Sequence, residues 1–351
     1  MAIGAWLPTA GATAEAVGSL QLPVEPDRLD RETMDWVHSA VPDNLSQFDR
    51  VARILRALQH DKDGPRVRYE EGFTGTAQEA FDTGIVNCLS FSQLVVAMAR
   101  EVGVEAFYMD VRKFQRFTKD GDLVIVAGHM TAGFDKGPER VILEFSVGPQ
   151  VNYRDAVKIS DETARAYYHS NRGAESLQAG DLVLAAEWLE TATRLDPELP
   201  DAWVNLGVVL RRQGDIEAAE SAYRRAIRLD GEFFPAYQNL AALYRLRGDA
   251  DSAARMLTLL ERRQPTNPFI YLALGDLSLE RGDLEDARRF YRRGRRLRRG
   301  EPDLLAALGE VALAMGKVEE AERWLAKGQK RGSDNPRVRR LAEAVERISK
   351  D

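Results

Sequence analysis

A cysteine, a histidine and a glutamate are the residues of this chain best suited to chemistry. Cys88 is the only cysteine among 351 residues. Apolar residues recur at helical spacing from Leu89 to Val102, and Gly103 can end that helix. Cys88 is therefore expected in the first turn, where the helix dipole favours a thiolate and lowers a cysteine pKa from about 8.5 to ~3.5–7.5. The sequence predicts a nucleophilic thiol, with a small buried apolar residue as the alternative.

His129 and Glu144 are expected on neighbouring strands of a hairpin. Apolar residues alternate over 130–134 and 141–145, and a turn over 135–140 contains Gly137-Pro138. In that register His129 and Glu144 share one face as direct or diagonal neighbours. The imidazole can take the proton of a thiol, and a carboxylate can orient the imidazole. We therefore expect Cys88, His129 and Glu144 as catalytic residues, although a lone strand histidine is more often structural.

Helices and strands around these residues are needed to bring them together. Helical patterns cover 27–59, and Thr76 can cap a short helix with Glu79 before Cys88 is reached. After the cysteine helix the periodicity changes to two, which predicts strands over 106–111 and 123–127 separated by a charged loop over 112–122.

The segment around Cys88 resembles the core motif of the bacterial transglutaminase-like superfamily. The resemblance lies in Thr76-Ala77-Gln78-Glu79-Ala80, in Asn87-Cys88-Leu89-Ser90-Phe91 and in the helix up to Ala106, and it extends over 43–153. It implies a papain-like α+β core and thiol acyl chemistry, with Cys88 as nucleophile and His129 as base. The third position is usually Asp, whereas this chain has Glu144.

A second pattern begins near Ala166 and repeats every 34 residues. Two columns of this repeat are invariant, and a third is small throughout. The glycines can end the first helix of each unit, and the small residues let paired helices approach closely. The columns are Gly180, Gly214, Gly248, Gly282 and Gly316; Ala185, Ala219, Ala253, Ala287 and Ala321; and Gly173, Gly207, Ala241, Gly275 and Gly309.

The period and the residues Trp203, Leu206-Gly207, Ala219, Tyr223 and Ala226 resemble tetratricopeptide repeats (TPR). The resemblance covers 166–336, with a capping helix after it, and implies a right-handed superhelix with a concave binding surface.

Asn171, Asn205 and Asn239 form one more column of the repeat. Three amides at this interval can bond the backbone of an extended peptide, since each offers a donor and an acceptor. The alternative is that asparagine is simply frequent at this position. The peptide-binding residues predicted here are Asn171, Asn205 and Asn239.

The composition of the chain bears on which binding partners are expected. The net charge of -6 gives no general attraction to nucleic acid, and the arginine-rich segment 288–299 is expected to be a solvated, partly neutralised face. No transmembrane run, cofactor motif or metal-ligand spacing is present in the sequence. The first 26 residues are expected to be flexible, either as a truncated signal sequence, which would make the protein periplasmic or exported, or as a tail of a cytoplasmic protein.

The predicted fold class is multidomain: an α+β transglutaminase-like domain over 27–165, then five TPR repeats with a capping helix over 166–351. The predicted function is thiol-dependent acyl transfer, either amide hydrolysis or transamidation, with the repeats binding a protein or peptide on their concave face. The alternative is a catalytically degenerate protein that acts as a TPR binding scaffold. The oligomeric state and the substrate are left open.

Overall fold

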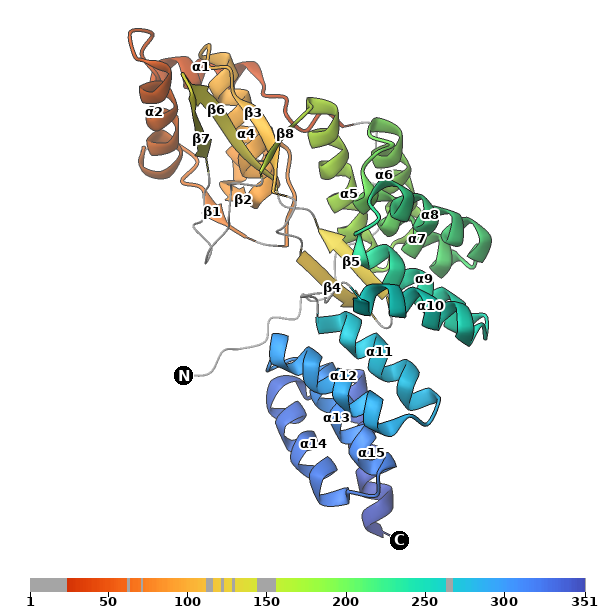
Figure 1. Cartoon of the computed structure of the whole chain (residues 1–351). Helices are drawn as coiled ribbons and strands as arrows, with labels where there is room; N and C mark the ends of the chain where they lie inside the picture. Colours follow the sequence, from red (N-terminus) through yellow and green to blue (C-terminus); the bar gives the residue numbers. More distant parts are fainter. Residues whose placement is uncertain are drawn as a thin grey trace.

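The computed structural model describes residues 24–61, 64–70, 72–111, 116–120, 123–127, 130–143, 156–262 and 268–350. Its first part contains four helices, which Figure 1 shows in red to orange: α1 (Arg31–Ala40), α2 (Gln47–His60), α3 (Ala77–Thr83) and α4 (Cys88–Glu101). Local sequence signals start these helices. Thr76 and Glu79 form the predicted capping box of α3, and Asn87 and Ser90 form one at the start of α4.

Short strands accompany these helices in three separate sheets. The largest is antiparallel and has the order β7-β6-β3-β8, and α4 packs against β6. The predicted hairpin is confirmed over its described residues, because Ala132 pairs with Leu143 and Phe134 with Val141. The strands are β1 (Arg68–Tyr69), β2 (Ile85–Val86), β3 (Phe107–Asp110), β4 (Arg116–Asp120), β5 (Leu123–Ala127), β6 (Met130–Lys136), β7 (Glu139–Leu143) and β8 (Val157–Ile159).

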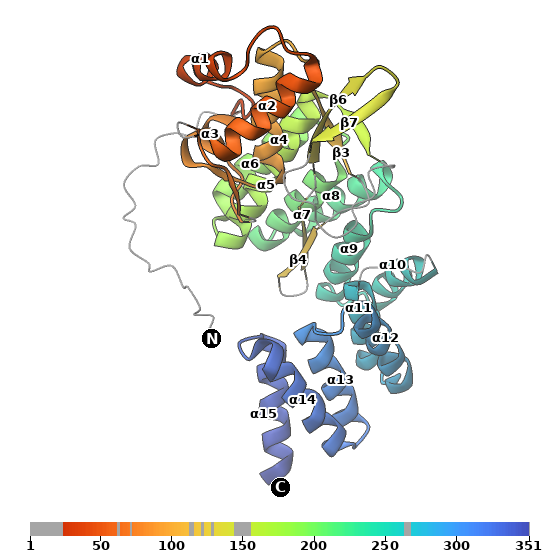
Figure 2. The ribbon, with the colours of Figure 1, turned by 90° about the vertical axis from the view of Figure 1, so that its left-hand side faces the viewer.

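The segment predicted as a charged loop over 112–122 contains strand β4, which forms an antiparallel pair with β5. This pair lies apart from the larger sheet. In both ribbon views it reaches the helices that follow in the chain (Figures 1 and 2), and β5 contacts α5, α7 and α9.

The second part is a succession of antiparallel helix pairs. Each pair packs on the next one, and together they form the long arc from green to blue in Figure 1. Gly180, Gly214, Gly248, Gly282 and Gly316 all adopt positive φ at the turn within a pair, as the invariant column requires. The pairs are α5 (Asp161–Ala179) with α6 (Leu182–Leu195), α7 (Pro200–Gln213) with α8 (Ile216–Leu229), α9 (Phe234–Leu246) with α10 (Ala250–Arg262), α11 (Pro268–Glu280) with α12 (Leu284–Leu297), and α13 (Pro302–Ala314) with α14 (Val318–Gly332); α15 (Pro336–Lys350) follows.

The small-residue column lets the two helices of a pair touch. A Cβ added at Gly207 would lie 2.5 Å from Cε1 of Tyr223, and one added at Gly275 would lie 2.2 Å from Cε1 of Tyr291. Both tyrosine rings are fully buried on the second helix of the same pair. Glycine is therefore needed at these positions because an aromatic ring of the partner helix occupies the space of a side chain.

The predicted fold class, with a papain-like α+β domain, is wrong. Fifteen helices dominate the described residues, and the eight strands are short and divided among three sheets. Strand β5 does not join the larger sheet, because it pairs with β4 and packs on the helix pairs. The fold is an all-α superhelix of helix pairs to which the short strands are attached.

Buried apolar residues connect the two parts of the chain. One cluster joins α1–α4 and the larger sheet to the beginning of α5 and α7 through Tyr167 and Ala202. A second cluster contains Leu123, Ile125 and Val126 of β5 together with residues of α5–α12. The strand is therefore part of the hydrophobic core of the repeats.

Candidate functional site

Cys88 is the first residue of α4, as predicted, and its side chain is buried at 9% exposure. The helix start around it is closely bonded. The Asn87 side chain accepts a hydrogen bond from the Ser90 N–H and donates one to Thr74 Oγ1, at 2.9 and 2.8 Å. The Ser92 hydroxyl lies 2.7 Å from the Cys88 carbonyl and 3.2 Å from the Met130 carbonyl, and so joins α4 to β6. Cys88 therefore lies at a helix start that is closely packed and hydrogen-bonded to its neighbours.

His129 and Glu144 lie outside the described residues, so the proposed Cys-His-Glu set is represented by its cysteine alone. Within the described ranges, no group of three or more His, Cys, Asp or Glu residues is arranged to hold a metal ion. None of the described helices is both long and apolar enough to cross a membrane.

Two residues of the predicted asparagine column bond the backbone of β5. The Val124 N–H donates to Asn239 Oδ1 and the Asn239 amide donates to the Val124 carbonyl, both at 2.8 Å. Asn205 makes the same pair of bonds with Val126, at 3.0 and 2.9 Å. Both asparagines are fully buried. The extended segment on these amides is thus a strand of the chain itself, and binding of a separate peptide stays a prediction.

Asn171, the first residue of the column, lies on α5 with 8% exposure. Its helix also contacts β5. The sequences of the other strands did not indicate that β5 would lie outside the larger sheet. One signal was available in the sequence, because Leu123–Ala127 is wholly apolar whereas a strand with one face in water usually alternates.

A groove of about 560 Å³ continues along the inner face beyond β5. The first helices α9, α11 and α13 and the terminal helix α15 line it, together with Leu257 of α10. Gln238 is 6% exposed there, and its Oε1 has no hydrogen-bond partner among the described residues. The same holds for the buried Nε of Arg245. Sequence reasoning missed both residues, because neither type is unusual on a helix.

Ion pairs connect the helices that line the groove at α15. Arg337 of α15 is buried and donates to Asp276 at 2.7 Å and, through Nε, to Glu310 at 2.9 Å. The two carboxylates raise the pKa of Arg337 against the effect of its burial. This pairing ties α15 to the fourth and fifth helix pairs.

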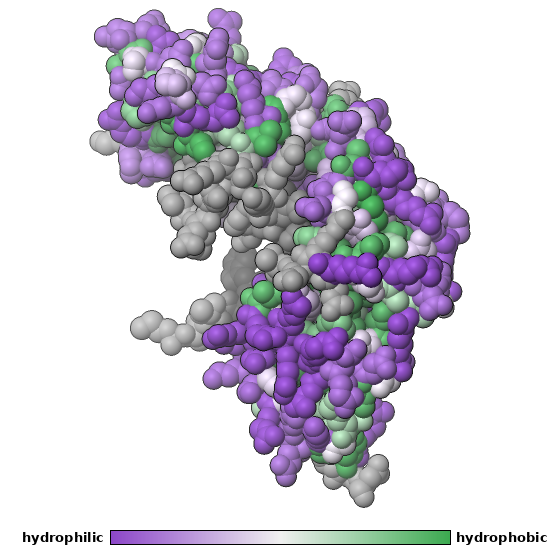
Figure 3. Space-filling view, in the orientation of Figure 1, coloured by the Kyte–Doolittle hydropathy of each residue, from purple (hydrophilic) through white to green (hydrophobic). Residues whose placement is uncertain are grey.

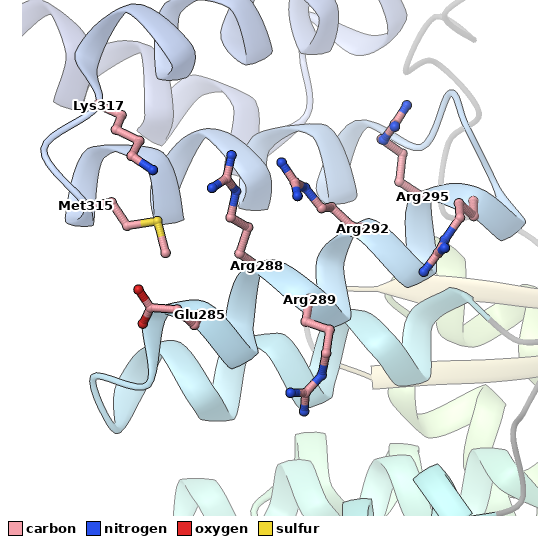
Figure 4. A pocket seen from close by; sticks show the side chains of 8 residues that line it. Glu285, Arg288, Arg289, Arg292, Arg295, Met315 and Lys317 are labelled. Carbon is pink, nitrogen blue, oxygen red and sulfur yellow. The ribbon is translucent and has the colours of Figure 1, made fainter.

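The arginine-rich segment forms a second hollow, of about 490 Å³, on α12 (Figure 4). Lys317, at the start of α14, faces Arg288 across it. Arg288 is paired with Glu320 at 2.8 Å and Arg289 with Asp286 at 2.6 Å. In Figure 3 this region is strongly hydrophilic. These pairs agree with the expectation of a solvated, partly neutralised face.

Two buried titratable residues lie where the first part of the chain meets the repeats. His169 of α5 accepts the Val24 N–H at Nε2, at 3.1 Å, and its Nδ1 lies 2.8 Å from the Arg165 carbonyl. Burial lowers the pKa of His169, so the neutral ring is favoured. Asp201 of α7 is 3% exposed. Burial, and then the charge of Asp110 on β3, raise the pKa of Asp201 to about 7.

Comparisons with known families agree with the helical repeats. Two tetratricopeptide-repeat models match, one over residues 175–232 and 239–302 and the other over 278–345. No curated protein matches the chain. The family matches fall on the helix pairs and not on the segment around Cys88, so a transglutaminase-like domain is not supported.

Solved structures give weak likenesses over about half of the chain. The Cut9 and Hcn1 hetero-tetramer of APC/C is 19% identical, with a TM-score of 0.48 over 53% of this chain and 37% of that chain. A thermophilic TPR protein of Thermus thermophilus is 21% identical, with a TM-score of 0.46 over 51% and 98%. The pilF protein of Pseudomonas aeruginosa is 21% identical, with a TM-score of 0.47 over 54% and 86%. The chain therefore spans little more than a third of the first of these proteins.

The 34-residue period, the helix pairs with a glycine at each turn and the family matches all coincide in the same residues. The C-terminal region of this chain consists of tetratricopeptide repeats.

Proposed function

We propose that the chain is a protein-interaction scaffold whose repeats hold an extended segment of a partner protein on their inner face. The observation that carries the proposal is the groove lined by α9, α11, α13 and α15. It contains buried polar atoms of Gln238 and Arg245 without partners among the described residues. A buried polar atom without a hydrogen bond destabilises a protein by about 1–3 kcal/mol, so a bound segment that supplies a donor to Gln238 would gain affinity there.

The neighbouring asparagines indicate how such a segment would bind. Asn205 and Asn239 already hold an extended backbone by paired bonds. Repeats present the same helix face at every unit, and the corresponding residue of the next unit is Ala273, which lines the open groove. A small residue there leaves room for the side chains of a bound segment.

Acyl transfer by Cys88, His129 and Glu144 is supported less well. Cys88 is almost wholly buried in a packed helix start. The predicted base and its orienting carboxylate lie outside the described residues. The function supported best is therefore binding.

A photo-crosslinking experiment tests the proposal. We would place p-benzoylphenylalanine at Ala273 in the groove and, as a matched control, at Leu259 on the exposed face of α10, which is 43% exposed. The proposal predicts that one partner segment crosslinks from Ala273 and not from Leu259. A synthetic peptide of that segment should then bind the purified full chain. Equal crosslinking from both positions, or none from Ala273, would contradict it.

A further inference from the structure

The β4–β5 pair occupies the part of the inner face where the asparagine column lies. Val124 and Val126 each present both backbone groups to one asparagine. The opposite edge of β5 faces β4, in a register that pairs Ile125 with Thr118. The repeats thus take the place of a further strand beside β5, with side-chain amides in the role of backbone groups.

Recognition through these four bonds depends on the backbone of the bound strand and not on its side chains. An asparagine that accepts from an N–H and donates to the carbonyl of the same residue can bind any residue type except proline, which has no N–H. Residues spaced by two in an extended strand present their backbone groups to the same edge. These four bonds therefore exclude proline at the two positions and select no other residue type.

Because Asn205 and Asn239 are buried, their amides need hydrogen-bond partners from a segment that occupies the site beside them. Asn205 and Asn239 are fully buried, and a buried amide without partners is unfavourable. The surrounding cluster is apolar and includes Leu206, Leu240 and Tyr237. Leu123, Ile125 and Val126 of β5 fill it, each at most 4% exposed. An occupant must accordingly be extended and uncharged over about five residues, with branched apolar side chains.

We propose that β5 is an internal occupant of the asparagine site, and that an extended apolar segment of a partner protein binds there by displacing it. This rests on the proposed scaffold function and adds its regulation: in the free protein the site is closed by the chain itself. A tethered segment acts at an effective concentration in the millimolar range. Consequently, a free peptide must compete with β5 and binds the intact protein more weakly than it binds the empty site.

The test uses the full-length chain and a fluorescein-labelled peptide, DLVIVAG, which has the sequence of residues 122–128. The double variant Val124→Pro and Val126→Pro removes the two β5 N–H groups that donate to Asn239 and Asn205, and leaves the asparagines intact. Fluorescence anisotropy should give a dissociation constant at least tenfold lower for this variant than for the wild type. Adding Asn205→Ala and Asn239→Ala to the proline variant should abolish binding. The control peptide DLPIPAG, which lacks the same two donors, should not bind.

The outcomes separate this inference from the scaffold function. Equal affinity of the peptide for the wild type and a folded proline variant would overturn displacement, while crosslinking from Ala273 would still support a scaffold. No binding to a folded proline variant would show that β5 is a permanent part of the core. If the proline variant does not fold, hydrogen exchange of the wild type decides: excess DLVIVAG should speed exchange of the Val124 and Val126 amides, and unchanged protection would refute the proposal.

Discussion

Replacing Asp201 with asparagine is expected to stabilise the protein at high pH. Asp201 is buried beside Asp110, and its pKa is raised from the ordinary value of 3.8 to about 7. Its Oδ1 has no hydrogen-bond partner among the described residues. The folded state therefore holds a proton that the unfolded state releases, and ionisation of Asp201 at higher pH opposes folding.

The magnitude follows from the two pKa values. One pKa unit corresponds to about 1.4 kcal/mol, so the full difference amounts to about 4 kcal/mol. Because the folded pKa is raised, the stabilisation is complete below pH 3.8 and is lost as the pH rises through about 7. Of this loss, about 2.5 kcal/mol falls between pH 5 and pH 8. Asp201→Asn has no ionisable group and should not show that part of the loss.

Urea denaturation at pH 5 and pH 8, followed by circular dichroism, measures the effect. The gain of Asp201→Asn over the wild type should be larger at pH 8 than at pH 5 by about 2.5 kcal/mol. Asp303 occupies the same helix position three repeats later and is only half-buried, so Asp303→Asn is the matched control. If Asp201→Asn changed stability equally at both pH values, the assignment of a buried, protonated carboxyl would be wrong.

Three further perturbations have defined outcomes. Gly207→Ala should lower the unfolding free energy by about 1–3 kcal/mol, because its Cβ would overlap the buried Tyr223 ring; chemical denaturation that showed no loss would contradict the close approach. Arg337→Leu should destabilise the chain by about 3–5 kcal/mol, because two carboxylates lose their buried partner, and limited proteolysis should then remove α15 first. Cys88 should react with iodoacetamide only when the protein unfolds, since it is 9% exposed; rapid labelling of the native protein in a mass-spectrometric time course would restore the thiol hypothesis.

The sequence predicts those parts of the structure that depend on local or periodic signals. The glycine column identifies the turn in each repeat because positive φ is a requirement of the residue itself. The capping box from Thr76 to Glu79 and the start of α4 at Cys88 likewise depend on neighbouring residues. The hairpin register followed from alternation of apolar residues.

Other parts depend on contacts between distant residues, and there prediction failed. The apolar run over 123–127 predicted a strand, but the sequence does not show that Asn205 and Asn239 bind the backbone of that strand. The papain-like fold was predicted from the resemblance around Cys88, and the sequence of that segment does not determine how the strands after it are arranged. The raised pKa of Asp201 depends on its burial near Asp110, 91 positions earlier in the chain, and no motif marks it.

The bonds between β5 and the repeats also affect the elasticity of the superhelix. Solenoids change curvature through small rotations between neighbouring units. Val124 and Val126 are bonded to two successive units, and two residues of a strand span a fixed distance of about 6.6–6.8 Å. Rotation between these units would stretch hydrogen bonds at both ends. Because Arg337 likewise bonds both Asp276 of α11 and Glu310 of α13, bending is expected at the junction between the α9–α10 unit and the α11–α12 unit. Both units line the open groove, so a change of curvature there alters its width.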